Sequence, residues 1–339
     1  MHNHDRFKRY SIAQCALYKC RSKARLEKLL LLEPGNLQLI NSAISYHSFE
    51  IEKKNSLEKR KITAPDRTLK LVQKRILILL QKVLRPTWLI SGEKGKCYID
   101  NGKAHLNGKF FLTIDIKKFY DNCKREPVYC FFTQKLLTSP DVAKILTDII
   151  TYDSRIPTGC PTSQIMAFYA YYDMFNEIAE YALKKNCTFT LYVDDMTFSS
   201  PEPLDPKVLQ RDVDRILRKY DHKPKYSKVK YYSASDYKPV TGTIITPDKS
   251  LAVPNSLQQK IYLGFQEIKS TTATTEYSDV SAKLASLKGQ IQAARNINRN
   301  KFPEIMRLTN KLAAAQPPLK PIKRKGVSYR KKTISINPN

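Results

Sequence analysis

The sequence offers little of what disulfide-bonded, zinc-binding or membrane-spanning proteins require. Its seven cysteines are odd in number and include no Cys-x-x-Cys pair, which argues against a zinc ribbon and a disulfide framework and indicates a reducing compartment. The apolar runs Leu29–Leu32 and Ile76–Leu80 are far shorter than the roughly 20 residues that cross a bilayer. The charged start also lacks the apolar stretch of a signal peptide. We therefore expect a cytoplasmic protein with no membrane partner.

Acidic residues are few compared with basic ones. The chain has 59 Lys and Arg residues against 31 Asp and Glu residues, a net charge of +28. Because such an excess repels itself and weakens the compact state, it usually serves a polyanionic partner. RNA or DNA is the first such partner, and a merely soluble basic surface or a surface for anionic lipid is the alternative. A chain of this length holds roughly two or three subdomains and is large enough for an enzyme.

Hydrophobic periodicity predicts the helices and strands. Residues 6–32 have the pattern of an amphipathic helix with a basic face that ends near Pro34 and Gly35. The further expected elements are a basic hairpin over 45–65, a helix over 69–84, strands over 110–116 and 188–198, a hairpin over 240–245 and 251–253, and helices over 255–268 and 280–315. The tail after Pro318 has several cations and no acid, so we expect it to be extended or disordered alone.

Two expected strands carry carboxylates among apolar residues. Asp194 and Asp195 are adjacent in such a strand, where a carboxylate must find cations or protons to offset its lost hydration. A strand-turn-strand with this pair at its tip aims carboxylate oxygens at a neighbouring strand end, where Asp115 completes an oxygen-ligand site for Mg²⁺. Two such ions activate a 3′-hydroxyl and stabilise both oxygens of phosphoryl transfer, which predicts a polymerase. Alone, an Asp-Asp pair is common in ordinary turns and would not indicate catalysis.

The motif Tyr192-Val193-Asp194-Asp195, downstream of Phe-x-x-x-Asp-Ile-x-x-Phe-Tyr at 111–120, resembles the palm of reverse transcriptases. The resemblance implies an α+β right-hand polymerase of fingers, palm and thumb, whose antiparallel palm sheet carries the catalytic aspartates. It makes Asp115 and Asp194 primary ligands of two Mg²⁺ ions, with the backbone of Ile116 beside them. Asp195 would support the metals less directly.

The segment Lys59–Pro65, followed by Leu69, Lys70 and Gln73, is similar to the fingers motif of that family. The similarity implies that Arg60 binds the incoming triphosphate, and a planar guanidinium suits phosphate oxygens. Lys53 on the opposite hairpin arm is a second candidate ligand. The alternative is a solvated hairpin edge that is protected by its charges.

Two side chains follow from the same resemblance. Tyr120 occupies the position of the aromatic residue that crowds a ribose 2′-OH and so selects deoxynucleotides, with a plain core tyrosine as the alternative. Lys228 lies where the family has a lysine that could protonate the pyrophosphate leaving group. The local register admits Lys230 equally well.

The segment Pro157–Gln164 resembles the loop and helix start beneath the templating base pair of the same family. There Gly159 would let the backbone approach the bound nucleotide. The segment departs from the usual pattern at Thr158, where the family has glutamine, and at Gln164, where it has proline. The pattern Gly-x-x-x-Ser-Gln at 159–164 is similar to the one in reverse transcriptases of diversity-generating retroelements.

Two further segments resemble elements of retron reverse transcriptases. They are Asn101-Gly102-Lys103-Ala104-His105 and Val240-Thr241-Gly242, and Asp195–Ser199 agrees with them. Asn101, His105, Val240, Thr241 and Gly242 are accordingly interpreted as retron-specific, RNA-binding residues, with a structural role for His105 as the alternative. The resemblance implies that the enzyme binds its own structured non-coding RNA. The enzyme would start synthesis at an RNA 2′-OH and copy part of this RNA into DNA that stays branched to the RNA. It would act in anti-phage defence with a separate effector protein.

The expected organisation follows this resemblance. It comprises a basic N-terminal helical region (1–39), fingers (40–110), a palm (111–250) with a helical insertion about 125–155, a helical thumb (251–316) and a basic tail (317–339). The alternatives are a diversity-generating or group II intron-like reverse transcriptase, and a non-polymerising RNA-binding scaffold or antitoxin.

Overall fold

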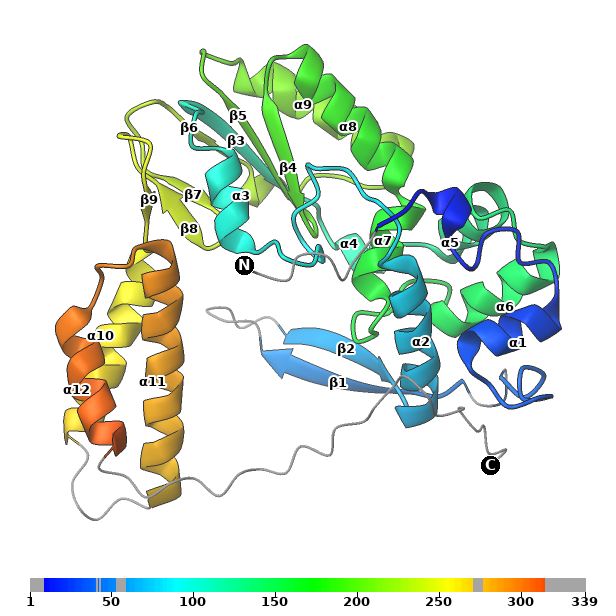
Figure 1. The fold of residues 1–339 in the computed structure, drawn as a ribbon. Helices are drawn as coiled ribbons and strands as arrows, with labels where there is room; N and C mark the ends of the chain where they lie inside the picture. Colours follow the sequence, from blue (N-terminus) through cyan, green and yellow to red (C-terminus); the bar gives the residue numbers. More distant parts are fainter. Residues whose placement is uncertain (1–8, 41, 43, 53–58, 271–276, 315–339) are drawn as a thin grey trace.

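The computed structural model describes residues 9–40, 42, 44–52, 59–270 and 277–314 (Figure 1). Lys53 and the basic tail, to which the sequence assigned roles, lie outside the described residues. Among the described residues, no helix is long and apolar enough to cross a membrane.

The described part of the N-terminal region, from residue 9 on, contains two short helices instead of the single helix expected over 6–32. They are the 3-10 helix η2 (Ile12–Gln14) and α1 (Lys23–Leu30). The Ser22 hydroxyl accepts a hydrogen bond from the Arg25 backbone N–H at 3.4 Å and so begins α1. Lys19 before it has φ of 51°, which interrupts a right-handed helix. The prediction of one helix was therefore wrong, because local capping and a left-handed residue divide the segment.

The expected hairpin and the helix after it are both present. β1 (Tyr46–Glu52) and β2 (Lys59–Pro65) pair antiparallel, with Tyr46 opposite Pro65. Asp66 then begins α2 (Arg67–Leu80), since its carboxylate accepts a hydrogen bond from the Leu69 N–H at 2.7 Å. The hairpin projects from the body of the protein and is largely exposed (Figure 1).

A four-stranded antiparallel sheet lies at the centre of the fold. Its strands, in spatial order, are β4 (Thr188–Tyr192), β5 (Asp195–Ser200), β3 (Phe110–Asp115) and β6 (Lys230–Tyr232). The register sets Asp115 directly opposite Asp195. The prediction that the two carboxylate-bearing strands lie side by side is confirmed.

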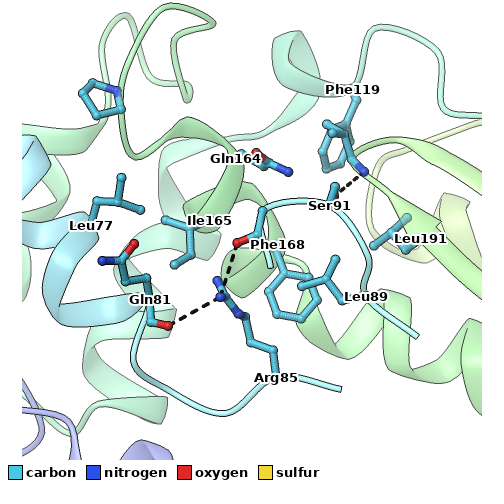
Figure 2. Close-up of a pocket in the computed structure, with 13 residues that line it drawn as sticks. Leu77, Gln81, Arg85, Leu89, Ser91, Phe119, Gln164, Ile165, Phe168 and Leu191 are labelled. Atoms are coloured by element: carbon cyan, nitrogen blue, oxygen red, sulfur yellow. Dashed lines mark hydrogen bonds between the residues drawn. The ribbon is translucent and has the colours of Figure 1, made fainter. Parts of the chain in front are cut away.

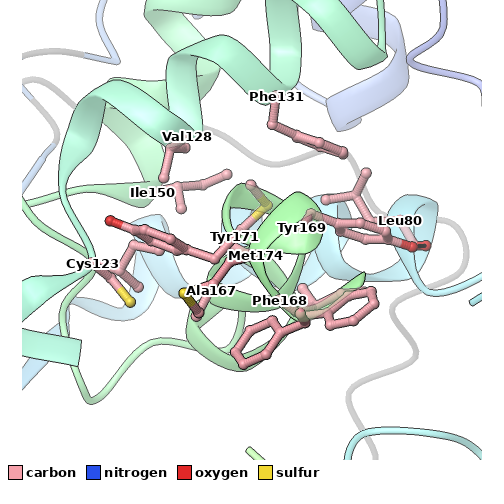
Figure 3. Close-up of a cluster of buried hydrophobic side chains, with 14 of the residues drawn as sticks. Leu80, Cys123, Val128, Phe131, Ile150, Ala167, Phe168, Tyr169, Tyr171 and Met174 are labelled. Atoms are coloured by element: carbon pink, nitrogen blue, oxygen red, sulfur yellow. Dashed lines mark hydrogen bonds between the residues drawn. The ribbon is translucent and has the colours of Figure 1, made fainter. Parts of the chain in front are cut away.

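Helices pack against this sheet and between it and α2 (Figure 1). They are α4 (Phe119–Asn122), α5 (Arg125–Cys130), the π-helix η3 (Phe131–Lys135), α6 (Pro140–Ile150), α7 (Ser163–Ala170), α8 (Tyr172–Lys184), α9 (Pro206–Lys219) and the 3-10 helix η4 (Tyr226–Lys228). Aromatic side chains fill the core between them: the rings of Phe131 and Tyr169 stack with centroids 4.8 Å apart (Figure 3). Burying each such ring stabilises the fold by about 1.5–3 kcal/mol.

A smaller sheet and helix α3 (Tyr98–Ala104) lie beside the central sheet (Figure 1). The small sheet contains β7 (Lys238–Val240), β8 (Thr243–Ile245) and β9 (Leu251–Ala252). The expected hairpin is formed by β8 and β9, but residues 240–245 are not one strand. Thr241 and Gly242 have φ of 41° and 88°, so they make a tight turn between β7 and β8.

Three C-terminal helices form a separate unit with its own apolar core. They are α10 (Asn255–Ser270), α11 (Tyr277–Ile297) and α12 (Pro303–Ala314). Phe265, Leu287 and Ile291 belong to this core, which is distinct from the main one. The single helix expected over 280–315 is divided, because Pro303 disfavours helical backbone at the residue before it and Phe302 has φ of 56°.

Candidate active site

The three predicted aspartates meet at one end of the central sheet. Asp115 is the last residue of β3, and Asp195 opposite it is the first residue of β5. The carbonyl oxygen of Asp194 accepts a hydrogen bond from the Ile116 N–H at 3.2 Å. Strand pairing therefore brings together the carboxylates and the Ile116 backbone, which the sequence had placed in one site.

The turn that presents Asp194 has a strained backbone. Val193 has φ of 62°, and left-handed backbone costs a residue with a Cβ roughly 1–2 kcal/mol. A hydrogen bond helps to hold this conformation, since the Val193 N–H donates to the hydroxyl oxygen of Ser91 at 2.7 Å. Ser91 was missed by the sequence analysis, because it belongs to no recognisable motif.

The carboxylates lie in an environment that disfavours their negative charge. Burial, followed by the charges of Asp195 and Asp115, raises the pKa of Asp194 to about 6. Burial and then Asp115 also raise the pKa of Asp195, and Lys228 acts in the opposite direction. An ammonium group faces this cluster: the Lys228 Nζ lies 3.1 Å from Asp115 Oδ1. Of the ion pairs between described residues, this is the one that involves the three aspartates, so their negative charge is only partly balanced there.

The donor set fits Mg²⁺ as a partly preformed site. Across the residues that the structure describes, no group of three or more His, Cys, Asp or Glu side chains is already arranged to hold an ion. Mg²⁺ usually binds one or two carboxylates together with substrate phosphates and not a complete protein cage. The aspartates supply the hard oxygen ligands and the negative charge that such an ion requires.

The Tyr120 phenol lies close enough to both Asp194 and Arg60 for their charges to shift its pKa. Tyr120 is on α4, and its ring centroid lies 5.5 Å from that of Phe119. Burial and then Asp194 raise the pKa of the Tyr120 phenol, and Arg60 lowers it. The phenol is therefore neutral at physiological pH. Arg60 is exposed on β2, and its charge is near enough to act on the Tyr120 phenol.

The loop that contains Gly159 packs on the hairpin. The Gly159 N–H donates to the Thr63 carbonyl oxygen at 3.0 Å, and the Thr158 hydroxyl donates to the Lys61 carbonyl oxygen at 3.2 Å. A Cβ at Gly159 would lie 2.6 Å from the Thr63 oxygen, which is closer than atoms can approach. The glycine is thus required for contact with β2, and its approach to a nucleotide stays a prediction.

The structure distinguishes the two candidate lysines by their positions. Lys228, in η4, pairs with Asp115. Lys230 follows on β6, where it is opposite Thr113 with an exposed side chain. Proton donation by Lys228 stays a prediction, but its ammonium group is the one that lies at the carboxylates.

The two retron-like segments contact each other inside the protein. The buried contacts of Asn101 and His105 described here are called the joint. The Asn101 amide donates to the Thr241 hydroxyl at 2.6 Å. The two ring nitrogens of His105 lie 2.7 Å from the hydroxyls of Ser199 and Thr190, on β5 and β4. The joint therefore connects α3 to the small sheet and to the strands that carry the aspartates.

The burial of this joint corrects the interpretation of its side chains as RNA contacts. Asn101 and His105 are 0% exposed and Val240 is 1% exposed. Burial also lowers the pKa of His105 to about 3, so its ring is neutral. RNA cannot reach these three side chains in this arrangement, and the structural alternative stated for His105 fits it. Thr241 and Gly242 are accessible, and their contact with RNA stays a prediction.

A cavity of about 180 Å³ adjoins the turn that presents the aspartates, since Val193 is among the residues that line it (Figure 2). Ser91, Gly92 and Val193 line it on the side of the turn, Gln164 on the side of α7, and Arg85 beneath. A Cβ at Gly92 would lie 3.1 Å from the Gln164 amide nitrogen. Gln164, one of the two residues that depart from the usual family pattern, thus packs against the segment that supports the turn.

A family model matches the greater part of the chain. Residues 42–267 match the model described as "Reverse transcriptase (RNA-dependent DNA polymerase)". Solved structures of telomerase from Candida albicans, with a fragment of telomeric RNA, and from Candida tropicalis share the fold at TM-scores of 0.50 and 0.52, with 13% and 12% identity. They cover 85% and 81% of this chain, which covers 66% and 58% of theirs. The expected α+β right-hand fold is confirmed.

Curated relatives include several retron reverse transcriptases. Retron Se72 reverse transcriptase of Salmonella heidelberg is 29% identical over 186 residues, which are 53% of this chain and 48% of the relative. Retron Ec48 reverse transcriptase of Escherichia coli is 25% identical over 246 residues, 68% of this chain and 60% of the relative. Retron Ec86 reverse transcriptase, also of Escherichia coli, is 28% identical over 171 residues, with 50% and 53% covered. This chain therefore spans 48–60% of the length of these relatives, and the resemblance to the retron type is confirmed.

Proposed function

Because this chain belongs to the reverse transcriptase family, we propose that it synthesises DNA on an RNA template at the site formed by Asp115, Asp194 and Asp195. The observation that carries the proposal is the register of β3 and β5, which sets Asp115 opposite Asp195 and beside Lys228. Adjacent carboxylates with raised pKa values that stay open to solvent are the feature expected of a site that awaits cations.

We assign a separate part of the reaction to each group of site residues. Asp115 and Asp194 would hold two Mg²⁺ ions, which when bound lower the pKa of the attacking hydroxyl and neutralise phosphate charge. Arg60 binds the triphosphate oxygens through its planar guanidinium. Tyr120 packs where a ribose 2′-OH would lie and excludes it by its volume. Lys228 donates a proton to the pyrophosphate oxygen as the bond to the α-phosphorus breaks.

We further propose the retron branch of the family. The support comes from the curated relatives and from the order of the two short segments that form the joint at Asn101 and Thr241. The chain would then bind a structured non-coding RNA and copy part of it from an RNA 2′-OH, giving branched RNA-DNA. A separate effector protein, a role in anti-phage defence and a cytoplasmic location complete this proposal.

The proposed subdomains follow the expected boundaries. The hairpin and α2 correspond to fingers (40–110), the central sheet to the palm (111–250), and the three C-terminal helices to the thumb (251–316). The separate apolar core of the C-terminal helices supports the last boundary. The described N-terminal helices belong to the region assigned to 1–39.

A second candidate has one observation in its favour. Thr158 and Gln164 depart from the usual pattern toward that of diversity-generating retroelements, and Gln164 packs at Gly92 in this structure.

Primer extension with a matched pair of variants tests the proposed chemistry. Wild-type protein with RNA template, primer, Mg²⁺ and deoxynucleotides should extend the primer, and Asp194→Asn should abolish extension while RNA binding in a filter assay survives. Asp173→Asn, which removes an exposed carboxylate paired with Lys135 on the outer surface, should leave extension unchanged. If the wild-type protein binds RNA but makes no DNA under any of these conditions, the chain is a scaffold and the proposal fails.

A further inference from the structure

The segment 85–93 runs along the outer edge of the central sheet beside the strand that leads into the aspartate turn. The Ile90 N–H donates to the Leu191 carbonyl oxygen at 3.0 Å, and the Leu191 N–H donates to the Trp88 carbonyl oxygen at 2.9 Å. These bonds form a parallel bridge that extends the sheet beyond β4. This pairing places Ser91 beside the turn that contains Val193.

Ser91 makes the contact at the end of this bridge. Its side-chain oxygen accepts the Val193 N–H at 2.7 Å (Figure 2). Ser91 is 6% exposed, so little water is available to replace this partner. Since Val193 has φ of 62°, its N–H points away from the ladder that the flanking strands form, and the hydroxyl supplies the missing acceptor. Asp194 directly follows Val193 in the chain.

Buried charges fix the segment that carries Ser91. The Glu93 carboxylate forms ion pairs with Arg85 and Arg9, and the side chains of Glu93 and Arg85 are 1% and 3% exposed. The Lys96 ammonium group donates to the carbonyl oxygens of Thr87 and Leu89 at 2.8 and 2.9 Å. A buried ion pair adds little net stability but favours one arrangement over others. These contacts therefore set the position of the segment.

We propose that Ser91 is a positioning residue of the polymerase site, which holds the Val193 backbone so that Asp194 faces Asp115, and that Glu93 fixes Ser91 through its pairs with Arg85 and Arg9. The inference rests on the proposed function of the aspartates. Through Arg9, the N-terminal region also becomes part of the support of the site. The proposal gives none of these side chains a contact with substrate.

The test compares three substitutions at Ser91 with a matched control in steady-state primer extension. Ser91→Ala removes the acceptor, Ser91→Cys keeps nearly the same volume with a weak acceptor, and Ser91→Thr restores a hydroxyl whose added methyl group can enter the adjoining cavity. The control is Ser200→Ala. Ser200 is 4% exposed, accepts the Glu202 N–H at 3.1 Å and lies at the opposite end of β5, facing Phe110.

The expected result separates positioning from stability. Ser91→Ala and Ser91→Cys should lower kcat about tenfold, equivalent to ~1.4 kcal/mol, raise the Mg²⁺ concentration for half-maximal rate, and leave KM for the deoxynucleotide within about twofold because no substrate contact is lost. Ser91→Thr should recover most of the rate. Ser200→Ala should lower the melting temperature to a similar extent without changing kcat or the Mg²⁺ dependence.

A double-mutant cycle tests the link to Glu93. If Glu93→Gln acts through Ser91, its effect on kcat should be smaller in the Ser91→Ala background than in the wild type. Wild-type kcat and Mg²⁺ dependence in both Ser91→Ala and Ser91→Cys would overturn the inference and leave the proposed function intact. The inference also falls if Ser200→Ala loses activity in the same proportion, since stability alone would then explain the loss. Absence of DNA synthesis by the wild type would overturn both.

Discussion

The side-chain amide of Asn101 donates to the hydroxyl of Thr241 at 2.6 Å, which joins two segments 140 residues apart in the chain. Asn101 is on α3, which also contributes to the burial of His105 against the strands that carry the aspartates. Thr241 stands in the turn between β7 and β8, shortly before the C-terminal helices begin. The Asn101 amide thus connects α3 to the small sheet, and His105 at the end of α3 connects it to the central sheet.

This bond predicts coupled effects on stability. Asn101→Ala should lower the free energy of unfolding by about 1–3 kcal/mol, because Thr241 and the buried surroundings lose a partner. Thr241→Ala should cost less in the Asn101→Ala background than in the wild type. Urea unfolding of the two single variants and the double variant measures this coupling, and strictly additive losses would contradict the joint.

Tyr120 predicts the sugar selectivity of the polymerase. Its ring is packed against Phe119, and its phenol is neutral and near Asp194, so its volume and not its charge should exclude a 2′-OH. Tyr120→Ala should increase the rate of ribonucleotide incorporation relative to deoxynucleotide incorporation by about tenfold or more, and Tyr120→Phe should keep the wild-type preference. Competition between the two nucleotide types in primer extension measures the ratio. An unchanged preference in Tyr120→Ala would remove Tyr120 from the selectivity assignment.

Gly159 predicts an effect of packing on the hairpin. A Cβ there would lie 2.6 Å from the backbone oxygen of Thr63, so Gly159→Ala must displace β2 or the loop, at about 1–3 kcal/mol. Because Arg60 is on the same strand, KM for the deoxynucleotide should rise. Gly264→Ala is the control: its Cβ would meet only Leu287 at 3.7 Å, an ordinary contact, and a helical Gly→Ala change should stabilise by about 0.5–1 kcal/mol. Thermal unfolding of both variants decides whether Gly159 is sterically required.

His222 predicts a pH dependence of stability. It is 2% exposed and packs against Phe119 and Tyr171, and neither of its ring nitrogens has a hydrogen-bond partner in the described part of the chain. Burial lowers its pKa to about 4, with Asp221 opposing this shift and Lys124 adding to it. Below pH ~6.5 His222 binds a proton in the unfolded chain but stays unprotonated in the folded chain. Stability is therefore lost as pH falls from about 6.5 toward 4.

His222→Phe should reduce this loss. At pH 5 the wild type should lose about 2 kcal/mol through His222 relative to pH 7, and the variant should lose that much less, since phenylalanine takes up no proton. His105 contributes in the same direction and is retained in both proteins. Urea unfolding at pH 7 and pH 5 measures the difference, with His47→Phe on the exposed hairpin as the control. Equal pH dependence in the wild type and His222→Phe would contradict the lowered pKa.

Local patterns predicted the features that depend on neighbouring residues. The aspartate strands, the hairpin and α2 were predicted because their apolar spacing and capping residues are adjacent in the sequence. Contacts between distant segments left no such pattern. Ser91 and Glu93 carry no motif, and their roles arise only when segment 85–93 pairs with β4.

The same limit explains the corrections. The helix expected over 6–32 is divided by capping at Ser22, and the one expected over 280–315 by the left-handed backbone of Phe302 before Pro303. A motif also does not say which way a side chain faces. Asn101 and His105 were recognised by their spacing, but only the fold shows that they are enclosed by protein.

We propose that Asp115, Asp194 and Asp195 catalyse the copying of RNA into DNA. Sequencing the nucleic acid that copurifies with the wild-type protein and with Asp194→Asn, each expressed with its cognate RNA, tests this most directly. The account predicts single-stranded DNA covalently linked to RNA with the wild type, and the RNA alone with the variant. RNA without any DNA on the wild-type protein, or the same DNA on Asp194→Asn, would contradict it.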